Sequence, residues 1–312
     1  MAGFKDIIGH EQIIDYLSRI LKEGKVAHAY IISGPEGSGK RLLADRFAKA
    51  IQCEAGYGDS CNMCRSCMQM DHGNHPDVKY VTHEKQSIGI EDVRTQINND
   101  VMIKPYNGKY KIYIIDEAEK LTTEAQNALL KTIEEPPQYA VIMLLTENSD
   151  LFLRTITSRC VALNLKPVPQ DKIVSYLMQE YKIPDYKAAV CAAFSQGSVG
   201  KAVLMATSSE YEEAQESVMR LMKRIERMEV YEIADEIRTI AGGSVGVNDI
   251  IDMMLVWYRD VLILKATGDA NLIINKDEFR YLKEKASAVT YEGLEDVIES
   301  MDKAKARLKA NV

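Results

Sequence analysis

The chain has 312 residues, a formal net charge of −7 at pH 7, 46% hydrophobic residues and 27% charged residues. This length exceeds that of one ordinary compact core, so we expect two or three domains with a soluble globular balance of residues. The net negative charge argues against a uniformly basic nucleic-acid-binding surface, although it is compatible with a local basic strip.

Neither the start nor the most apolar segment of the chain has the pattern of a membrane or export signal. Residues 1–6 do not run from basic to apolar as a signal peptide does. The most apolar long segment, residues 250–267, contains Asp252, Arg259 and Asp260. It is therefore a poor membrane span and a good buried helix, and we expect a cytoplasmic protein.

Residues 6–51 contain a helix, a strand, a glycine-rich loop and a second helix. An amphipathic helical pattern ends near residue 22, and the apolar run 28–33 predicts a strand. The loop that follows matches G-x-x-x-x-G-K-[ST] through Gly34, Gly39 and Lys40. Strand, loop and helix in this order make the segment a strong phosphate-loop candidate, since the loop amides and the lysine bind phosphates.

One residue departs from the phosphate-loop pattern. The last position should be a Ser or Thr, whose hydroxyl holds Mg²⁺ beside the phosphates, but the chain has Arg41 there. A guanidinium has no lone pair for a metal and stays charged. Glu36 adds a negative charge where phosphates would bind. The loop therefore looks like a nucleotide site that lacks a part required for hydrolysis.

Four cysteines lie within fifteen positions after the second helix. Their spacing is C-x7-C-x2-C-x2-C, through Cys53, Cys61, Cys64 and Cys67. In a reducing compartment this density favours a metal over disulfides, and four thiolates can close a tetrahedral Zn²⁺ site. Iron–sulfur ligation and unligated thiols remain the alternatives.

Three further strands, alternating with helices, are predicted at residues 78–81, within the run 111–119, and at residues 140–146. Alternation of this kind predicts a parallel sheet covered on both faces, an α/β fold. Asp116 and Glu117 lie at the C-terminal end of the second of these runs. Paired with a phosphate loop, such carboxylates can hold Mg²⁺ through water and activate an attacking water molecule.

The second half of the chain is predicted to be helical. Pro167 and Pro169 mark a hinge, and Ser209 with Glu212 has the pattern of a capping box that opens a helical block. Residues 248–267 form a helix that is apolar around most of its circumference and is closed by Gly268. An ordinary buried core helix is the favoured interpretation, and a subunit contact is the alternative.

Two weaker motifs concern basic residues. Arg159 in Ser158-Arg159-Cys160 could be no more than a salt-bridge partner, and on spacing alone that interpretation is preferred. Lys201 lies in the first turn of a helix that follows a glycine-rich turn, a position from which a lysine can reach a bound phosphate. A solvated lysine is the more frequent case.

Together these motifs resemble the bacterial clamp loaders, the branch of the AAA+ ATPases that serves DNA polymerase III. Within that branch they resemble the delta-prime family most closely. The resemblance is dense over the first 165 residues, moderate to about residue 206 and faint beyond. It rests on residues 8–11 and 27–30, the phosphate loop, the four-cysteine segment, and residues 115–121, 127–137 and 155–160.

The resemblance implies three domains: an AAA+ nucleotide-fold domain (1–165), a helical lid (166–207) and a helical collar (208–312) that builds a pentameric ring. Clamp loaders of this family combine gamma/tau, delta and delta-prime subunits. They place a ring-shaped sliding clamp on primed DNA and use ATP bound between neighbouring subunits. Relatives usually run on into a last collar helix where this chain ends, at Asn311 and Val312.

The resemblance also assigns roles to residues. It implies that Arg159 acts in trans on the phosphates held by the next subunit, and that the four cysteines hold a structural zinc. The nucleotide-binding positions it implies, in a degenerate site, are Gly34, Gly37, Gly39, Lys40, Asp116, Glu117, and the two sensor positions Asn148 and Lys201.

Three hypotheses follow for the function. In the first, the chain is a stationary subunit that hydrolyses no ATP itself and completes a neighbour's site with Arg159; the loss of the hydroxyl at Arg41 favours it. In the second, the chain is an ATP-hydrolysing gamma/tau-like motor in which Asp116 and water hold the metal. In the third, it is a zinc-dependent nucleic-acid-binding module, which the acidic residues around the cysteines disfavour.

Overall fold

The computed structural model describes residues 3–83, 86–242 and 245–309, and it divides into two compact units. The first unit comprises Met1–Lys172 and Gly197–Gly200, and the second comprises Ile173–Gln196 and Lys201–Val312. Asn311 and Val312, where relatives were expected to continue, lie outside the described residues. The division into three domains at residues 165 and 207 stays a prediction.

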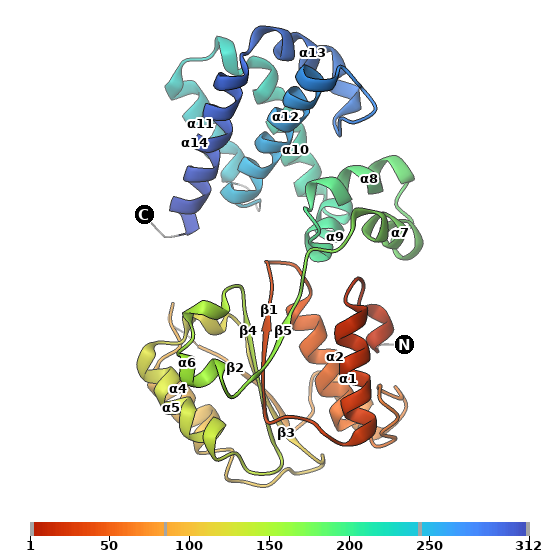
Figure 1. The fold of residues 1–312 in the computed structure, drawn as a ribbon, viewed down its shortest axis with the longest axis vertical. Coiled ribbons are helices and arrows are strands. Elements are labelled where there is room, and N and C mark those ends of the chain that lie inside the picture. Colours follow the sequence, from red (N-terminus) through yellow and green to blue (C-terminus); the bar gives the residue numbers. More distant parts are fainter. Residues whose placement is uncertain (1–2, 84–85, 243–244, 310–312) are drawn as a thin grey trace. The chain divides into compact units, whose positions relative to one another are not determined.

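The first unit is built on a five-stranded parallel sheet (Figure 1). Its strand order is β2-β3-β4-β1-β5. This sheet confirms the predicted α/β fold with a parallel sheet. The strands are β1 (Ala29–Ser33), β2 (Val78–Val81), β3 (Lys111–Ile115), β4 (Ala140–Thr146) and β5 (Val161–Asn164).

Strand β5 was not predicted. It has only four residues, and among them only Leu163 is buried, because the strand lies at the edge of the sheet. By contrast, every residue of β3 and β4 is buried, which gives the continuous apolar runs that predicted those two strands.

Helices cover both faces of the sheet (Figure 1). Alternate residues of β1 point to opposite faces, so Tyr30 and Ile32 pack with α1 and α2, whereas Ala29 and Ile31 pack with α4, α5 and α6. The helices of this unit are α1 (Glu11–Glu23), α2 (Lys40–Gln52), α3 (Arg65–Asp71), α4 (Ile90–Val93), α5 (Thr123–Glu134) and α6 (Arg154–Thr157), with short turns at Phe4–Asp6, Arg94–Asn98, Ala118–Lys120 and Ser149–Leu151.

The second unit is helical, as predicted, and the described chain beyond Asn164 contains no strand. One detail of the prediction was wrong: the hydroxyl that caps α10 belongs to Ser208, not Ser209, and accepts the Tyr211 N–H. The helices are α7 (Gln170–Glu180), α8 (Asp185–Phe194), α9 (Val199–Thr207), α10 (Ser209–Arg224), α11 (Val230–Ala241), α12 (Val247–Thr267), α13 (Phe279–Ala288) and α14 (Tyr291–Lys309), with turns at Ile225–Arg227 and Lys276–Glu278. The first residues of α7 and α9 belong to the first unit.

Helix α12 is the core of the second unit. Helices α10, α13 and α14 pack around it, and Trp257 and Tyr258 are buried. The buried Asp260 accepts hydrogen bonds from the backbone N–H groups of Ile274 and Asn275, which fixes the loop before α13. Helix α12 is therefore the predicted buried core helix, and it ends at Gly268 in the left-handed conformation.

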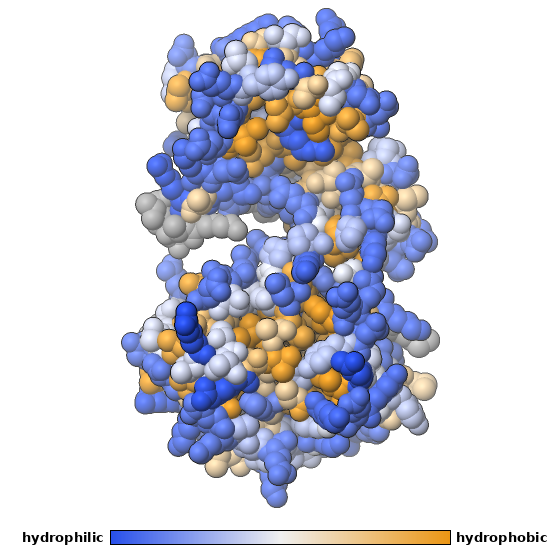
Figure 2. Space-filling model, in the orientation of Figure 1, coloured by the Kyte–Doolittle hydropathy of each residue, from blue (hydrophilic) through white to orange (hydrophobic). Residues whose placement is uncertain are grey.

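No helix within the described residues is both long and apolar enough to cross a membrane. The visible face of each unit is mostly hydrophilic, with separate apolar areas between the charged residues (Figure 2). This surface is typical of globular units, in which scattered exposed apolar residues are normal.

Candidate nucleotide site and metal centre

The predicted nucleotide-site residues of the first unit gather at one edge of the sheet. Strands β3, β4 and β1 are parallel neighbours, and their carboxyl ends lead directly to Asp116, Asn148 and the phosphate loop, respectively. Ligands of open α/β sheets bind outside these strand ends. The fold thus places the loop and the two strand-end positions at the same edge of the sheet.

The backbone of the phosphate loop has the conformation that its glycines permit. Gly37 and Gly39 have φ angles of 69° and 91°, in the left-handed region that favours glycine. A Cβ atom at Gly34 would lie 2.9 Å from the carbonyl oxygen of Leu165. The Lys40 ammonium donates to the carbonyl oxygens of Gly34 (2.8 Å) and Pro35 (3.0 Å). The loop lysine is therefore held by its own loop.

The short segment Gly197–Gly200 packs on the phosphate loop within the first unit. The Gly200 N–H donates to the Gly37 carbonyl at 2.9 Å, and the Ser198 hydroxyl donates to the Glu36 carbonyl at 3.0 Å. A Cβ atom at Gly200 would lie 3.0 Å from the same Gly37 oxygen. The glycine-rich turn that the sequence singled out is thus a backbone partner of the phosphate loop.

Arg41, which replaces the metal-binding hydroxyl, contacts Asp45, Tyr80 and Asp116. We call these four residues the Arg41 cluster. Arg41 Nη1 is 3.0 Å from Asp116 Oδ2, and Arg41 Nε is 3.3 Å from Asp45 Oδ1. The guanidinium carbon lies 4.0 Å from the centre of the Tyr80 ring, a cation–π distance. The Tyr80 hydroxyl donates to Asp45 Oδ1 at 2.9 Å. Three elements, α2, β2 and the end of β3, hold the guanidinium.

Electrostatics in the Arg41 cluster keep the guanidinium charged. Burial lowers the pKa of Arg41, but the carboxylates of Asp45 and Asp116 outweigh it and leave that pKa raised. Burial raises the pKa of Asp45, although hydrogen bonds from Tyr80 and Arg41 oppose the rise. A permanent cation therefore occupies one oxygen of the carboxylate that the sequence assigned to Mg²⁺.

Glu117, the predicted water-activating carboxylate, is also engaged in an ion pair. Lys120 Nζ lies 2.7 Å from Glu117 Oε2, and the ring of His83 lies 3.9 Å from the same oxygen. The backbone of Glu117 has φ 48°, which is uncommon for a residue with a side chain.

Asn148 at the end of β4 uses its side chain locally. Its Oδ1 accepts the N–H of Asp150 at 2.9 Å and so caps the turn Ser149–Leu151. Its predicted contact with a nucleotide stays a prediction.

Arg159 lies between α6 and β5 at the surface of the first unit. Its side chain is 42% exposed and pairs with Glu134 on α5 at 3.2 Å, and its Nη1 donates to the Thr155 carbonyl at 3.0 Å. Such exposed ion pairs contribute about 0–1 kcal/mol, so a stronger partner can replace Glu134 at little cost.

Lys201, at the second predicted sensor position, makes two ion pairs with residues of the second unit. Its ammonium lies 2.6 Å from Asp249 and 2.7 Å from Asp252, both on α12. Lys305 on α14 binds the other oxygen of Asp252. The pairs with Asp249 and Asp252 thus join α9 to α12, and the predicted role of Lys201 in binding nucleotide stays a prediction.

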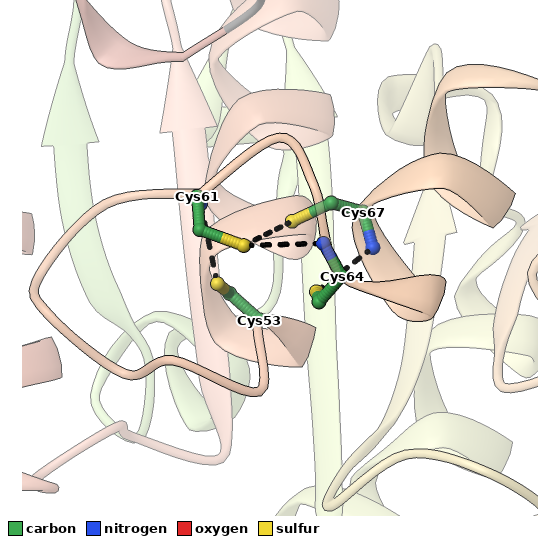
Figure 3. A group of neighbouring side chains, drawn as sticks. All are labelled: Cys53, Cys61, Cys64 and Cys67. Atoms are coloured by element: carbon green, nitrogen blue, oxygen red, sulfur yellow. Dashed lines mark hydrogen bonds between the residues drawn. The ribbon is translucent and has the colours of Figure 1, made fainter.

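The four predicted metal ligands converge (Figure 3). The sulfur atoms of Cys53, Cys61, Cys64 and Cys67 all lie within 4.8 Å of one another, and those of Cys61 and Cys67 are 4.0 Å apart. Cys53 ends α2, and Cys64 caps α3 by accepting the Cys67 N–H. Two helix ends and the loop between them therefore position the four thiols.

The geometry fits a tetrahedral thiolate site. Zn–S bonds of about 2.3 Å place tetrahedral sulfurs about 3.8 Å apart, close to the separation found here. The N–H groups of Met63 and Cys64 lower the pKa of Cys61 to about 6, whereas burial raises the pKa of Cys67. Bound zinc would favour the thiolate at all four positions.

The two nearby histidines are engaged elsewhere. His75 Nε2 lies 2.9 Å from the Ser66 hydroxyl, and His75 Nδ1 accepts the Asp77 N–H. His72 Nδ1 lies 2.7 Å from the Met68 carbonyl oxygen. The ligand set of the described residues is therefore the four cysteines alone, and a closed shell of four thiolates is typical of structural zinc.

Sequence reasoning missed the partners of the predicted site residues. Asp45 lies four residues after Arg41, an i,i+4 spacing that could have signalled their ion pair. No local signal pairs Tyr80 with Arg41, Glu134 with Arg159, or α12 with Lys201, because these contacts join segments distant in sequence.

Comparison with known proteins places the chain. The model of the family described as "DNA polymerase III, delta subunit" matches residues 9–169, about half of the chain. The chain is 28% identical to DNA polymerase III subunit delta' of Bacillus subtilis over 96% of its own length and 91% of that protein. It is 27% identical to DNA polymerase III subunit tau of the same organism over 98% of its own length, but it spans only 58% of that relative.

Among solved structures, a DNA polymerase III gamma subunit-related protein of Thermotoga maritima is 20% identical. The match covers 94% of this chain and 99% of that protein, with a TM-score of 0.42. The family match, together with the phosphate loop at the end of β1 and the four-cysteine segment after α2, leads to one assignment. The chain belongs to the DNA polymerase III delta-subunit family of clamp-loader proteins.

Proposed function

We propose that this chain is a delta-prime-type stationary subunit of a clamp loader and that it completes the ATPase site of a neighbouring subunit with Arg159. The observation that carries the proposal is the ion pair between Arg41 and Asp116. A subunit that hydrolysed ATP at its own loop would need that carboxylate for Mg²⁺.

Hydrolysis at the chain's own loop is disfavoured by three features together. Arg41 supplies no metal ligand, its charge covers Asp116, and Lys120 pairs with Glu117. Restoring the metal site would require breaking the Arg41 cluster and turning a guanidinium out of a position that a ring and two carboxylates stabilise. Binding of a nucleotide without catalysis is compatible with the loop backbone.

Arg159 suits a role in trans. Its guanidinium is half-exposed at the surface, and its pair with Glu134 is weak enough to exchange. The planar guanidinium can make two parallel hydrogen bonds to a phosphate and stabilise charge that develops during phosphoryl transfer. Arg159 would therefore act as an arginine finger for the next subunit.

The proposed assembly follows from the relatives. We place the chain beside gamma/tau and delta subunits in a pentameric ring, held by a collar at residues 208–312. That ring would load the sliding clamp onto primer–template DNA during replication in the cytoplasm, so the chain would contribute to the DNA polymerase III holoenzyme without its own ATP turnover. The delta' and tau relatives support membership of such an assembly.

We further propose that Cys53, Cys61, Cys64 and Cys67 hold a structural zinc ion. The all-sulfur donor set and its spacing support zinc. The ion would tie the end of α2 to the start of α3 and would take no part in phosphoryl transfer, since four thiolates leave no open position.

The alternative function is that of an ATP-hydrolysing gamma/tau-like motor, which the similarity to the tau relative favours. The purified chain, assayed alone with ATP and Mg²⁺, separates the two. Turnover that disappears in the Lys40→Ala variant would establish the motor and remove the stationary-subunit proposal.

A nucleic-acid-binding zinc module is less well supported. Such a module needs a basic face, and the exposed lysine and arginine residues near the cysteines are Arg65 and Lys79, of which Lys79 pairs with Asp100 at 2.8 Å. The acidic residues of the same region outnumber them: Glu54, Asp59, Asp71 and Asp77.

The proposed finger is tested in the assembled loader. An arginine finger contributes about 10³-fold or more to hydrolysis, so Arg159→Ala should remove the turnover of the one neighbouring site that it serves and leave ring assembly intact. Arg154→Ala is the matched control, because Arg154 is an exposed arginine on the adjoining helix α6. Unchanged ATP turnover by the Arg159→Ala loader would show that the finger assignment is wrong.

A further inference from the structure

Lys49 is a buried lysine next to the four-cysteine segment, and neither the fold nor the proposed ATPase arrangement accounts for it. It lies on α2, one turn before Cys53, and its side chain is only 1% exposed. Lysines are almost never fully buried unless they are paired, because removing an ammonium from water is costly. The position therefore requires strong partners.

Two partners of Lys49 lie in and directly beside the cysteine segment. Its Nζ lies 2.6 and 2.7 Å from the two carboxylate oxygens of Asp71, and it donates to Asn62 Oδ1 at 2.6 Å. One ammonium thus contacts two residues, Asn62 within the segment and Asp71 four residues after its last cysteine.

Each partner controls the placement of particular cysteines. Asn62 lies between Cys61 and Cys64, and its φ of 61° places it in the left-handed conformation that turns the chain there. This conformation is unfavourable for a residue with a side chain, so a contact that holds it has structural value. The backbone N–H of Asn62 also points to the Cys67 sulfur.

Asp71 is the last residue of α3, the helix that carries Cys67 in its first turn. By binding both carboxylate oxygens of Asp71, Lys49 fixes α3 against α2. The same ammonium thereby sets the turn between the second and third cysteines and the helix of the fourth. A Zn²⁺ ion with four thiolates has a net charge of −2, which also favours a buried cation nearby.

We propose that Lys49 is a positioning residue for the metal centre, holding Asn62 and Asp71 so that the four sulfurs are preorganised for a tetrahedral ion. The inference rests on the metal site proposed above. Partners outside the ligand shell typically contribute 10-fold to 100-fold to metal affinity. A residue that acted only in general packing would leave affinity unchanged.

The test is metal affinity of the full chain, measured by titration of the reduced apo-protein with Co²⁺ and Zn²⁺ against a competing chelator. Lys49→Met, Asp71→Asn and Asn62→Gly should each weaken binding by about 10-fold to 100-fold. Asn62→Gly keeps a backbone that accepts positive φ and removes only the side-chain acceptor. Lys25→Met is the control, since Lys25 lies at the surface in an exposed pair with Glu23.

The stability of metal-free protein separates positioning from general packing. In a Cys53→Ser background that cannot close the site, a positioning residue should contribute less to the free energy of unfolding than it does in zinc-loaded protein. Equal destabilisation by Lys49→Met in both backgrounds, with unchanged metal affinity, would overturn the inference. If Lys49→Met does not fold, the Asn62→Gly and Asp71→Asn variants test the inference. Metal affinities of these two variants equal to that of the unmodified chain would also overturn it. Failure of the unmodified chain to bind either ion would instead refute the metal site itself.

Discussion

Arg41 and Asp116 are 75 residues apart in the chain and form an ion pair of 3.0 Å at the carboxyl end of β3. In a phosphate-loop ATPase this edge of the sheet holds a divalent cation between a loop hydroxyl and a strand-end carboxylate. Here a side chain of the protein supplies the positive charge. The pair is the basis of the first prediction.

Arg41→Thr should restore Mg²⁺-dependent nucleotide binding. The substitution returns a hydroxyl to the end of the loop and releases Asp116 from its ion pair, so ATP affinity in the presence of Mg²⁺ should rise about tenfold or more, about 1.4 kcal/mol. Calorimetric titration with and without Mg²⁺ measures the change. Arg94→Thr, which removes an exposed pair with Glu91, is the control. Equal affinities for the Arg41→Thr variant and the unmodified chain would contradict the prediction.

The zinc site should contribute to stability. Elemental analysis should give about one zinc per chain, and Cys64→Ser should abolish it and lower the thermal midpoint. A loss of about 2 kcal/mol corresponds to about 4–8 °C in a unit of this size. Cys191→Ser is the control because Cys191 is buried in the second unit, outside the ligand set. Apo-protein that melts at the same temperature as zinc-loaded protein would refute a stabilising role.

Lys201 should stabilise the second unit. Lys201→Met removes the ion pairs with Asp249 and Asp252, although Asp252 keeps its pair with Lys305. The free energy of unfolding should therefore fall by about 2 kcal/mol. Denaturant unfolding measures it. Lys187→Met, which breaks a more exposed pair with Glu212, should cost less than about 1 kcal/mol. A Lys201→Met protein of unchanged stability but weaker nucleotide binding would favour the sensor role instead.

Asp100 should make the first unit sensitive to acid. Burial raises the pKa of Asp100, but hydrogen bonds from Lys79, Lys111 and Tyr113 outweigh it and leave that pKa below its ordinary value. Because the folded pKa is lowered, the contribution to stability is present above the ordinary pKa of about 3.9 and is lost as the pH falls through the lower folded value.

Asp100→Asn should therefore cost about 3 kcal/mol at pH 7, since it leaves the buried Lys111 without its carboxylate, and should flatten the fall in stability below about pH 5. Urea unfolding at a series of pH values provides the measurement. Asp15→Asn, which changes an exposed carboxylate of the same unit, is the control. An Asp100→Asn profile that parallels the unmodified one would contradict the prediction.

Much of the fold could be predicted because its signals are local. The bounds of β2 and β4 matched the predicted ranges, since apolar runs between polar turns are read directly from the sequence. Strand β5 gave no such signal, being short and half-exposed at the sheet edge. The cap at Ser208 was misplaced by one residue because Ser209 offers the same chemistry.

The candidate site likewise has a part that the sequence predicted and a part that it did not. The cysteine spacing predicted a cluster because the four ligands lie on one short segment, and the structure brings them together. The sequence also showed that Arg41 could not bind a metal, but not that the guanidinium would contact Asp116, since that pair depends on how α2 packs on the sheet. The buried position of Lys49 was equally invisible, because a lysine in an amphipathic helix is normally solvated.

The cation beside Asp116 has a consequence for timing. A magnesium ion arrives with each nucleotide and departs with the product, whereas Arg41 is covalently part of α2 and can do neither. In the proposed loader, the charge at this edge of the sheet should thus be the same before, during and after every round of ATP turnover by other subunits. If the other subunits of the loader change their bound nucleotide and metal in each round, this subunit would be the one whose charge at this edge stays constant.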